Sequence, residues 1–436
     1  MIVEPGVALP REARYFRWLQ LAMGVVCMAM IANLQYGWTL FVDPIDAKFH
    51  WGRPAIQLAF TLFVVTETWL VPIEAWFVDK YGPRLVVLFG AVMIALAWVL
   101  NSVADSLLLL YVAAIIGGIG AGSVYGTCVG NALKWFPDRR GLAAGLTAAG
   151  FGAGAAITVV PIANMIVSSG YPSAFFTFGI GQGAIVFILA FFLRKPQRAM
   201  PPKRKQLNLP QSKIDYAPPQ VLRTPIFWVM YLVFVMVAAG GLMTAAQIAP
   251  IAKDFNIANT PVGLLGLQMA ALTFAISLDR IFDGFGRPFF GWISDIIGRE
   301  HTMFIAFSTA AAMLLTLSVV GGNAVVFVLA TAIYFGVFGE IYSLFPATSG
   351  DTFGAKFAAT NNGMLYTAKG TAALLVPLAS LIAEHFGWQA VFVIAVALNA
   401  LAALLALFVI KPMRRHFILG NEAKTSASPV PDRIAV

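Results

Sequence analysis

Long apolar runs separated by short polar segments follow one another along the whole chain. Each run has about 20 or more residues that are apolar or small, the length that a helix needs to cross the hydrocarbon core of a bilayer. The runs do not alternate between polar and apolar residues, and they are too long for the strands of a membrane β-barrel. The pattern predicts twelve membrane-spanning helices, at about residues 16–41, 55–77, 85–104, 107–134, 142–168, 173–193, 226–252, 261–292, 301–321, 324–346, 361–384 and 388–410.

Composition supports an all-α membrane protein. The 436 residues are 59% hydrophobic and only 11% charged, whereas soluble domains have about 25% charged residues. The two cysteines, Cys27 and Cys128, both lie in predicted spans and show no disulfide or metal-ligand spacing. Motifs for zinc proteases, phosphate-binding loops and nucleophile elbows do not occur. We therefore expect neither an enzyme nor a bound cofactor or metal.

The distribution of basic residues predicts the orientation in the membrane. With twelve spans both termini lie on one side, and that side holds 22 of the 29 Lys and Arg residues. Because cytoplasmic loops are enriched in Lys and Arg, both termini are expected in the cytoplasm. The net charge of +9 then reflects this topology and attraction to anionic lipid at the cytoplasmic face, rather than nucleic-acid binding.

A basic, proline-rich segment divides the chain into two halves of six predicted spans. We expect an N-terminal bundle at 1–193, a cytoplasmic linker at 194–225, a C-terminal bundle at 226–410 and a cytoplasmic tail at 411–436. The halves also share a trace of sequence. The segment "PIEAWFVDKYG" at 72–82 and the segment "PFFGWISDIIG" at 288–298 have Pro, Trp, Asp and Gly at matching places.

This organisation resembles the major facilitator superfamily. The segment "DKYGPR", which includes Asp79 and Arg84, resembles the superfamily's loop motif between spans two and three, and "DIIGRE", with Asp295 and Arg299, resembles its second copy. The resemblance implies two six-helix bundles with the substrate bound near the midplane between them. Access then alternates as one bundle rocks against the other, and the loop motif takes part in that change.

Two basic residues inside predicted spans are candidates for anion binding. Arg287 lies in the eighth span and Lys369 in the eleventh, where a charged side chain is costly and is a functional hypothesis by default. An arginine binds a carboxylate through its planar fork, and a lysine acts as a point charge. Two such cations facing one space suit a small dicarboxylate.

Further charged residues in the spans have two interpretations, which remain open. Asp283 lies four residues before Arg287, the favourable order for a helical ion pair. Internal neutralisation of this kind is one interpretation, and binding of a proton that is coupled to transport is the other. The residues concerned are Glu67, Asp279, Arg280, Asp283 and Glu340, with Glu74 nearby in the second span.

Aromatic residues recur near the middle of the predicted spans. General packing is the default explanation for any one of them, but tyrosines beside glycines are less ordinary and would shape a cage for a small planar solute. The candidates are Tyr36, Tyr125, Phe151, Phe338, Tyr342 and Tyr366.

Several segments together resemble the bacterial oxalate:formate antiporters. They include "NLQYGWTL", "WFPDRRGLAAG", "GRPFFGWISDIIGR", "YSLFP" and "AKGTA", of which the last contains Lys369. The resemblance implies that Arg287 and Lys369 bind the two carboxylates of oxalate, in a site lined by Tyr36, Gln57, Tyr125 and Tyr342. It also implies exchange of oxalate for formate in the bacterial inner membrane, by a protein that we expect to be a monomer.

One expectation concerns the empty site. Without substrate, two unpaired cations would face a low-dielectric interior. The empty protein should therefore change its side of access slowly, and exchange should dominate over net transport. The alternative function is a proton-coupled symporter of monocarboxylates or other organic anions, in the same superfamily. It predicts uptake into vesicles without a counter-anion and a dependence on acid pH.

Overall fold

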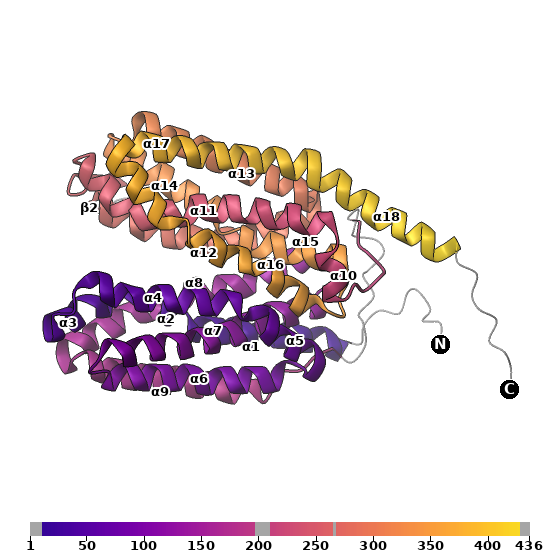
Figure 1. Cartoon of the computed structure of the whole chain (residues 1–436), viewed down its shortest axis with the longest axis horizontal. Helices are drawn as coiled ribbons and strands as arrows, with labels where there is room; N and C mark the ends of the chain where they lie inside the picture. Colours follow the sequence, from indigo (N-terminus) through magenta and orange to yellow (C-terminus); the bar gives the residue numbers. More distant parts are fainter. Residues whose placement is uncertain (1–10, 197–209, 265–266, 428–436) are drawn as a thin grey trace.

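The computed structural model describes residues 11–196, 210–264 and 267–427, and it consists of two helical bundles that lie side by side (Figure 1). The first bundle contains α1 (Arg11–Ile31), α2 (Asn33–Tyr36), α3 (Thr39–Phe49), α4 (Arg53–Trp69), α5 (Val71–Tyr81), α6 (Pro83–Val103), α7 (Leu107–Trp135), α8 (Arg140–Ser169) and α9 (Tyr171–Ala190). The second follows the short α10 (Pro218–Leu222) and contains α11 (Pro225–Asp254), α12 (Ala271–Ile297), α13 (Arg299–Val320), α14 (Ala324–Phe338), α15 (Ile341–Phe353), α16 (Ala358–Ala373) and α17 (Val376–Leu405). A π-helical turn (Ala406–Ile410) and α18 (Lys411–Ala427) follow the second bundle.

Most of these helices are suited to a membrane. In the described part of the chain, nine helices are long and apolar enough to cross it, or ten if the bent pair of α4 and α5 counts as one span. The two remaining predicted spans fall short for identifiable reasons. Helix α12 carries four charged residues from Asp279 to Arg287. Helix α16 has only 16 residues before the helix is interrupted at Leu374. The total of twelve spans therefore stays a prediction.

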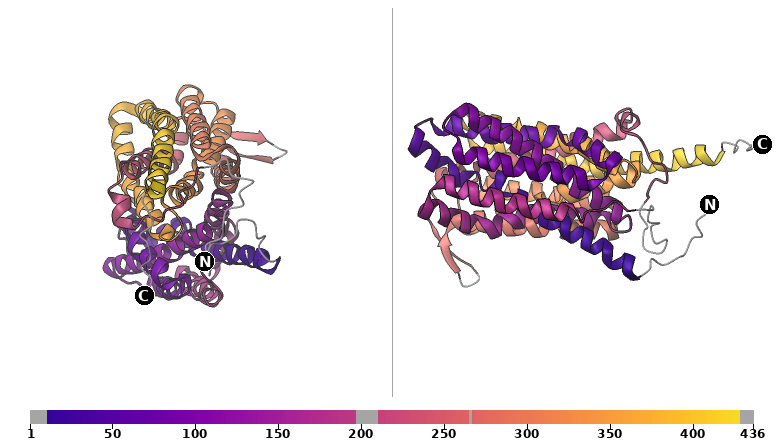
Figure 2. Two further views of the ribbon diagram at one scale, coloured as in Figure 1. Left: turned by 90° about the vertical axis from the view of Figure 1, so that its right-hand side faces the viewer. Right: turned by 90° about the horizontal axis from the view of Figure 1, so that it is seen from below.

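The predicted start of the eighth span is wrong. Residues 261–264 and 267–270 are not helical, because β1 (Pro261–Leu264) and β2 (Leu267–Ala270) pair as antiparallel strands, with Pro261 opposite Ala270. Helix α12 begins only at Ala271. The two strands lie at the opposite end of the molecule from α18 (Figure 2). Apolarity alone did not distinguish this pair of strands from the first turns of a helix.

Three predicted spans are broken near their middle. The breaks lie at Leu70 between α4 and α5, at Gly339 and Glu340 between α14 and α15, and at Leu374 and Leu375 between α16 and α17. Pro72 follows the first break and cannot donate the hydrogen bond that would continue α4. Glu67 and Lys369 each lie on the last turns before a break. Broken helices of this kind are tolerated at membrane depth where they border a cavity or packed protein.

The bundles contact each other through two sets of helices. Helix α8 packs against α12 and α15, and α16 packs against α4, α5 and α7. Glycines allow the first contact: a methyl group at Gly141 would meet the backbone of Gly291, and one at Gly145 would meet the carbonyl of Arg287. Small residues at such positions let helix backbones approach closely. We call the end at which α1 begins and α18 lies the termini end (Figure 1).

Candidate functional site

A central cavity of about 70 Å³ lies between the bundles. That volume is enough for a few water molecules or one small anion. The N-terminal bundle contributes Gln35, Tyr36, Tyr125 and Phe151, and the C-terminal bundle contributes Leu242, Ala245, Arg280, Asp283, Arg287, Phe335, Phe338, Tyr342, Tyr366 and Lys369. The structure thus brings together eight of the nine residues that the sequence nominates for substrate binding. Gln57 is the exception: it is exposed on α4 and is not among the lining residues, where Gln35 lies instead.

Arg287 reaches across the cavity from α12 and is buried. One of its terminal nitrogens, Nη2, pairs with the carboxylate of Asp283 at 2.6 Å, and the other donates to the carbonyl of Ala148 on α8 at 2.9 Å. Nη2 also lies 3.5 Å from the hydroxyl of Tyr36, and the guanidinium stands 4.9 Å from the centre of the Tyr342 ring. The arginine is therefore paired within its own helix and bonded to the opposite bundle.

Lys369 is buried on α16, with its ammonium in contact with the N-terminal bundle. The Nζ atom lies 3.0 Å from Oε2 of Glu67 on α4 and 3.3 Å from Oε1. It also donates to the hydroxyl of Tyr366 at 2.9 Å and to Oε1 of Gln35 at 3.4 Å. The Tyr366 hydroxyl in turn donates to Oε1 of Glu67 at 3.1 Å. The lysine therefore has a buried carboxylate as its partner.

Aromatic rings form the walls between the two cations. Tyr125 stacks on Tyr366 across the bundles, with the ring centres 4.4 Å apart and the planes inclined by 21°. Tyr36 meets Phe151 edge to face at 5.3 Å, and Phe151 lies 5.9 Å from Tyr125. Aromatic rings with hydroxyl groups at the wall of a cavity favour a small planar solute.

The other charged candidates divide into two groups. The Arg280 guanidinium lies 5.2 Å from the centre of the Tyr36 ring. Buried Asp279 and exposed Arg280 both border a smaller cavity of about 20 Å³ beside the central one. Glu340 and Glu74 are also buried but do not line the central cavity. In the described part of the chain, neither carboxylate oxygen of Glu340 has a hydrogen-bond partner.

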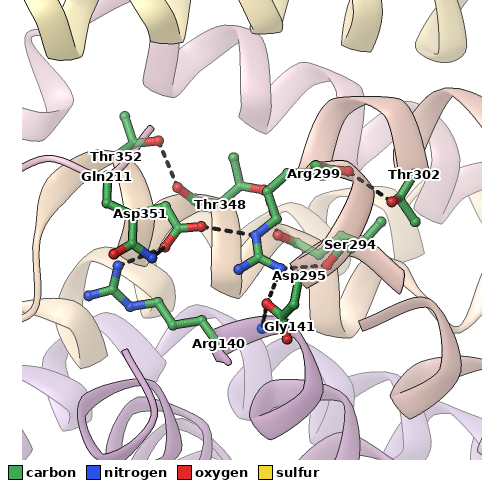
Figure 3. A network of polar contacts seen from close by, with 12 residues as sticks. Arg140, Gly141, Gln211, Ser294, Asp295, Arg299, Thr302, Thr348, Asp351 and Thr352 are labelled. Carbon is green, nitrogen blue, oxygen red and sulfur yellow. Dashed lines mark hydrogen bonds and ion pairs between the residues drawn. The ribbon is translucent and has the colours of Figure 1, made fainter. Parts of the chain in front are cut away.

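A network of charged side chains joins the bundles at the termini end (Figure 3). Asp351 on α15 accepts from Arg140 of the N-terminal bundle at 2.7 Å and from Arg299 at 2.9 Å. Arg299 also pairs with Asp295 at 2.6 Å, and Asp295 accepts the backbone N–H groups of Gly141 and Leu142 at 3.0 and 2.9 Å. These two amides begin α8, where the helix dipole favours a negative charge. We call this set of contacts the closed-end network.

A second contact at this end follows the same chemistry. Asp79 on α5 pairs with Lys134 and accepts from both the backbone N–H and the hydroxyl of Thr360 at the start of α16, at 2.8 and 2.6 Å. Three of the four residues predicted for the loop motif therefore bond across or beside the bundle interface. The fourth, Arg84, is exposed at the start of α6.

Sequence reasoning missed three members of the closed-end network. Arg140 lies in the conspicuous "PDRRG" segment, and Asp351 ends an apolar run, so both carried a weak signal. Gln211 did not, because it is one polar residue in a polar linker. Its side-chain amide donates to Asp351 at 2.7 Å and to the carbonyl of Pro137 at 3.1 Å.

Sequence comparison places the chain among known membrane transporters. The family model of the Major Facilitator Superfamily matches residues 21–375 and, in a second match, 239–432. The oxalate:formate antiporter of Oxalobacter formigenes is 36% identical over 94% of this chain and 96% of its own length. An uncharacterized MFS-type transporter of Escherichia coli, YhjX, is 24% identical over 82% of this chain and 86% of its own.

Solved structures show the same fold at low sequence identity. The proton:xylose symporter XylE superposes with a TM-score of 0.72 at 12% identity, covering 91% of this chain and 96% of its own. The transporter FucP in its outward conformation gives a TM-score of 0.68 at 14% identity, covering 90% of this chain and 99% of its own. At these identities the likeness establishes the fold alone.

Proposed function

This chain belongs to the major facilitator superfamily and, within it, to the family of the oxalate:formate antiporter, and from that membership we propose that it exchanges oxalate for formate by alternating access. The observation that carries the proposal is the joint presence of Arg287 and Lys369 in one central cavity with aromatic walls. A dicarboxylate as short as oxalate requires two cations near each other, and the family membership supplies the identity of the anion.

We assign the two cations different parts in binding. The fork of Arg287 binds one carboxylate of oxalate in two places, and Lys369 binds the other carboxylate. The stacked rings of Tyr125 and Tyr366 stand beside the lysine. Formate has one carboxylate and can satisfy only one of the cations, so it binds more weakly and leaves more readily.

We place the protein in the bacterial inner membrane with twelve spans. In this arrangement α12 forms the eighth span, and α16 with the start of α17 forms the eleventh. The termini end then faces the cytoplasm, where its basic residues meet anionic lipid. The two buried carboxylate partners make the charges of α12 and α16 tolerable at membrane depth. Each monomer contains a complete cavity.

Alternating access in this proposal depends on the closed-end network. Breaking the contacts of Asp351 and Asp295 separates the bundles at the cytoplasmic side and opens the cavity there. Oxalate entering as a dianion while formate leaves as a monoanion carries one net negative charge inward. A potential of 100 mV changes the free energy of such a cycle by about 2.3 kcal/mol.

Counterflow of labelled oxalate tests the proposal. Proteoliposomes loaded with unlabelled oxalate should accumulate labelled oxalate from a dilute external solution, and external formate should compete at higher concentration. Vesicles without protein give the background. Absence of accumulation above that background, with accumulation of another labelled carboxylate in its place, would reject oxalate as the substrate.

A further inference from the structure

Both cations of the central cavity already have a carboxylate partner. Arg287 pairs with Asp283 at 2.6 Å, and Lys369 pairs with Glu67 at 3.0 Å. The expectation that the empty site holds two unpaired cations is therefore wrong for this chain. That expectation made exchange obligatory, because an empty site with uncompensated charges would be costly to turn from one side of the membrane to the other. This reason no longer applies.

The partner of Lys369 comes from the opposite bundle and is held firmly. The side chain of Glu67 is 0% exposed and that of Lys369 is 5% exposed. Helix α4 packs closely on α7 at this point: a methyl group at Gly118 would lie 3.0 Å from the backbone nitrogen of Glu67, and one at Gly122 would lie 2.7 Å from its carbonyl oxygen. The packing fixes the backbone of Glu67, so its carboxylate stays within reach of Lys369.

Cationic and carboxylate side chains around the cavity are equal in number. The cations are Arg280, Arg287 and Lys369, and the carboxylates are Asp279, Asp283 and Glu67. An uncompensated charge inside a protein costs several kcal/mol, whereas a paired and hydrogen-bonded charge costs much less. The two ion pairs therefore lower the cost of moving the empty site, without help from the carboxylates of a substrate.

We propose that Glu67 is a resident counter-ion of Lys369 that allows the empty protein to change its side of access, so that it also carries out net transport of a carboxylate anion without a counter-anion. The inference rests on the proposed function, because it takes Lys369 to be a substrate ligand. When substrate binds, its carboxylate takes over contacts of the ammonium that Glu67 and Gln35 occupy in the empty state. When substrate leaves, Glu67 restores the pair, and the empty protein returns.

The test compares two fluxes from the same proteoliposomes, loaded with labelled oxalate and held at zero potential with potassium and valinomycin. The first is release into a medium that contains unlabelled oxalate, which measures exchange. The second is release into a chloride medium without carboxylates, which requires the empty protein to return. For the unmodified protein we expect the second flux to reach at least a tenth of the first. In Glu67→Gln, the ratio of the second flux to the first should fall at least tenfold.

Two further variants make the result specific to the charge at this position. Glu67→Asp keeps the carboxylate and should retain a ratio closer to that of the unmodified protein than to that of Glu67→Gln. Glu384→Gln removes an exposed carboxylate from α17 and should leave the ratio unchanged. If Glu67→Gln does not fold, the ratio of the unmodified protein together with that of Glu67→Asp still decides the matter.

The outcomes separate this inference from the function on which it rests. Exchange of oxalate by the unmodified protein, without release into chloride medium above the background of protein-free vesicles, overturns the inference and leaves the proposed function intact. An equal ratio in Glu67→Gln and the unmodified protein overturns the role of Glu67. Absence of exchange as well as release overturns both.

Discussion

Replacing Lys369 by glutamine tests the site through its buried ion pair. The substitution removes the ammonium but keeps a side chain of similar length that can bond to Gln35 and Tyr366. It leaves the carboxylate of Glu67, which is 0% exposed, with the Tyr366 hydroxyl as its remaining partner. Removing one member of a buried ion pair typically lowers the free energy of unfolding by about 3–5 kcal/mol. We therefore expect Lys369→Gln to lower the melting temperature in detergent and to abolish oxalate exchange.

A double variant separates these two effects. In Glu67→Gln/Lys369→Gln the unpaired charge is gone, and two amides can bond to each other in place of the ion pair. Replacing both partners is far less costly than breaking the pair, so the double variant should regain more than half of the lost stability. It should not regain exchange, because the cation for the second carboxylate is still missing. Exchange by a folded Lys369→Gln at a rate near that of the unmodified protein would refute the assignment of this lysine.

Three further predictions address the other parts of the account. Arg287→Lys keeps the charge but loses the planar fork that also reaches Ala148, so the oxalate concentration for half-maximal counterflow should rise at least tenfold, or about 1.4 kcal/mol. Asp351→Asn removes the negative charge that two buried arginines share, so spin labels at Arg84 and Lys356 should report longer distances across the termini end. Gly145→Ala places a methyl group against the backbone of α12, so the melting temperature and the exchange rate should both fall.

Each of these has a matched control or a contrary result. A methyl group at Gly181 would have no atom within 4 Å, so Gly181→Ala should leave the melting temperature unchanged, and an equal loss in both glycine variants would contradict the packing argument. Unchanged distances in Asp351→Asn would show that the closed-end network does not hold the bundles together. An unchanged oxalate concentration for half-maximal counterflow in Arg287→Lys would mean that the positive charge at this position, and not the planar fork, binds the substrate.

Much of the helical architecture follows from the hydrophobic pattern. Runs of apolar residues predicted the helices of both bundles, because in a bilayer every span must satisfy its own backbone hydrogen bonds. The pattern failed where local geometry decides the outcome. It did not predict the paired strands before α12, nor the breaks beside Leu70 and Leu374, because a broken apolar helix and a continuous one have nearly the same composition.

The residues that line the cavity were more predictable from the sequence than the ion pairs they form. Basic residues are so costly inside spans that Arg287 and Lys369 stood out at once, and the aromatic candidates collected around them. The i, i+4 spacing indicated the pair of Asp283 with Arg287. The partner of Lys369 is 302 residues away in the sequence, on a helix of the other bundle. Spacing along one helix cannot identify such a partner, and only the packing of α16 against α4 does.

The release of labelled formate tests the central claim most directly. Proteoliposomes are loaded with labelled formate, held at a defined potential, and diluted into medium with or without unlabelled oxalate. The account predicts that external oxalate accelerates formate release, and that an inside-positive potential accelerates it further because one net negative charge moves inward. Formate release that does not respond to external oxalate, from a preparation that binds and moves other anions, would contradict the exchange of oxalate for formate.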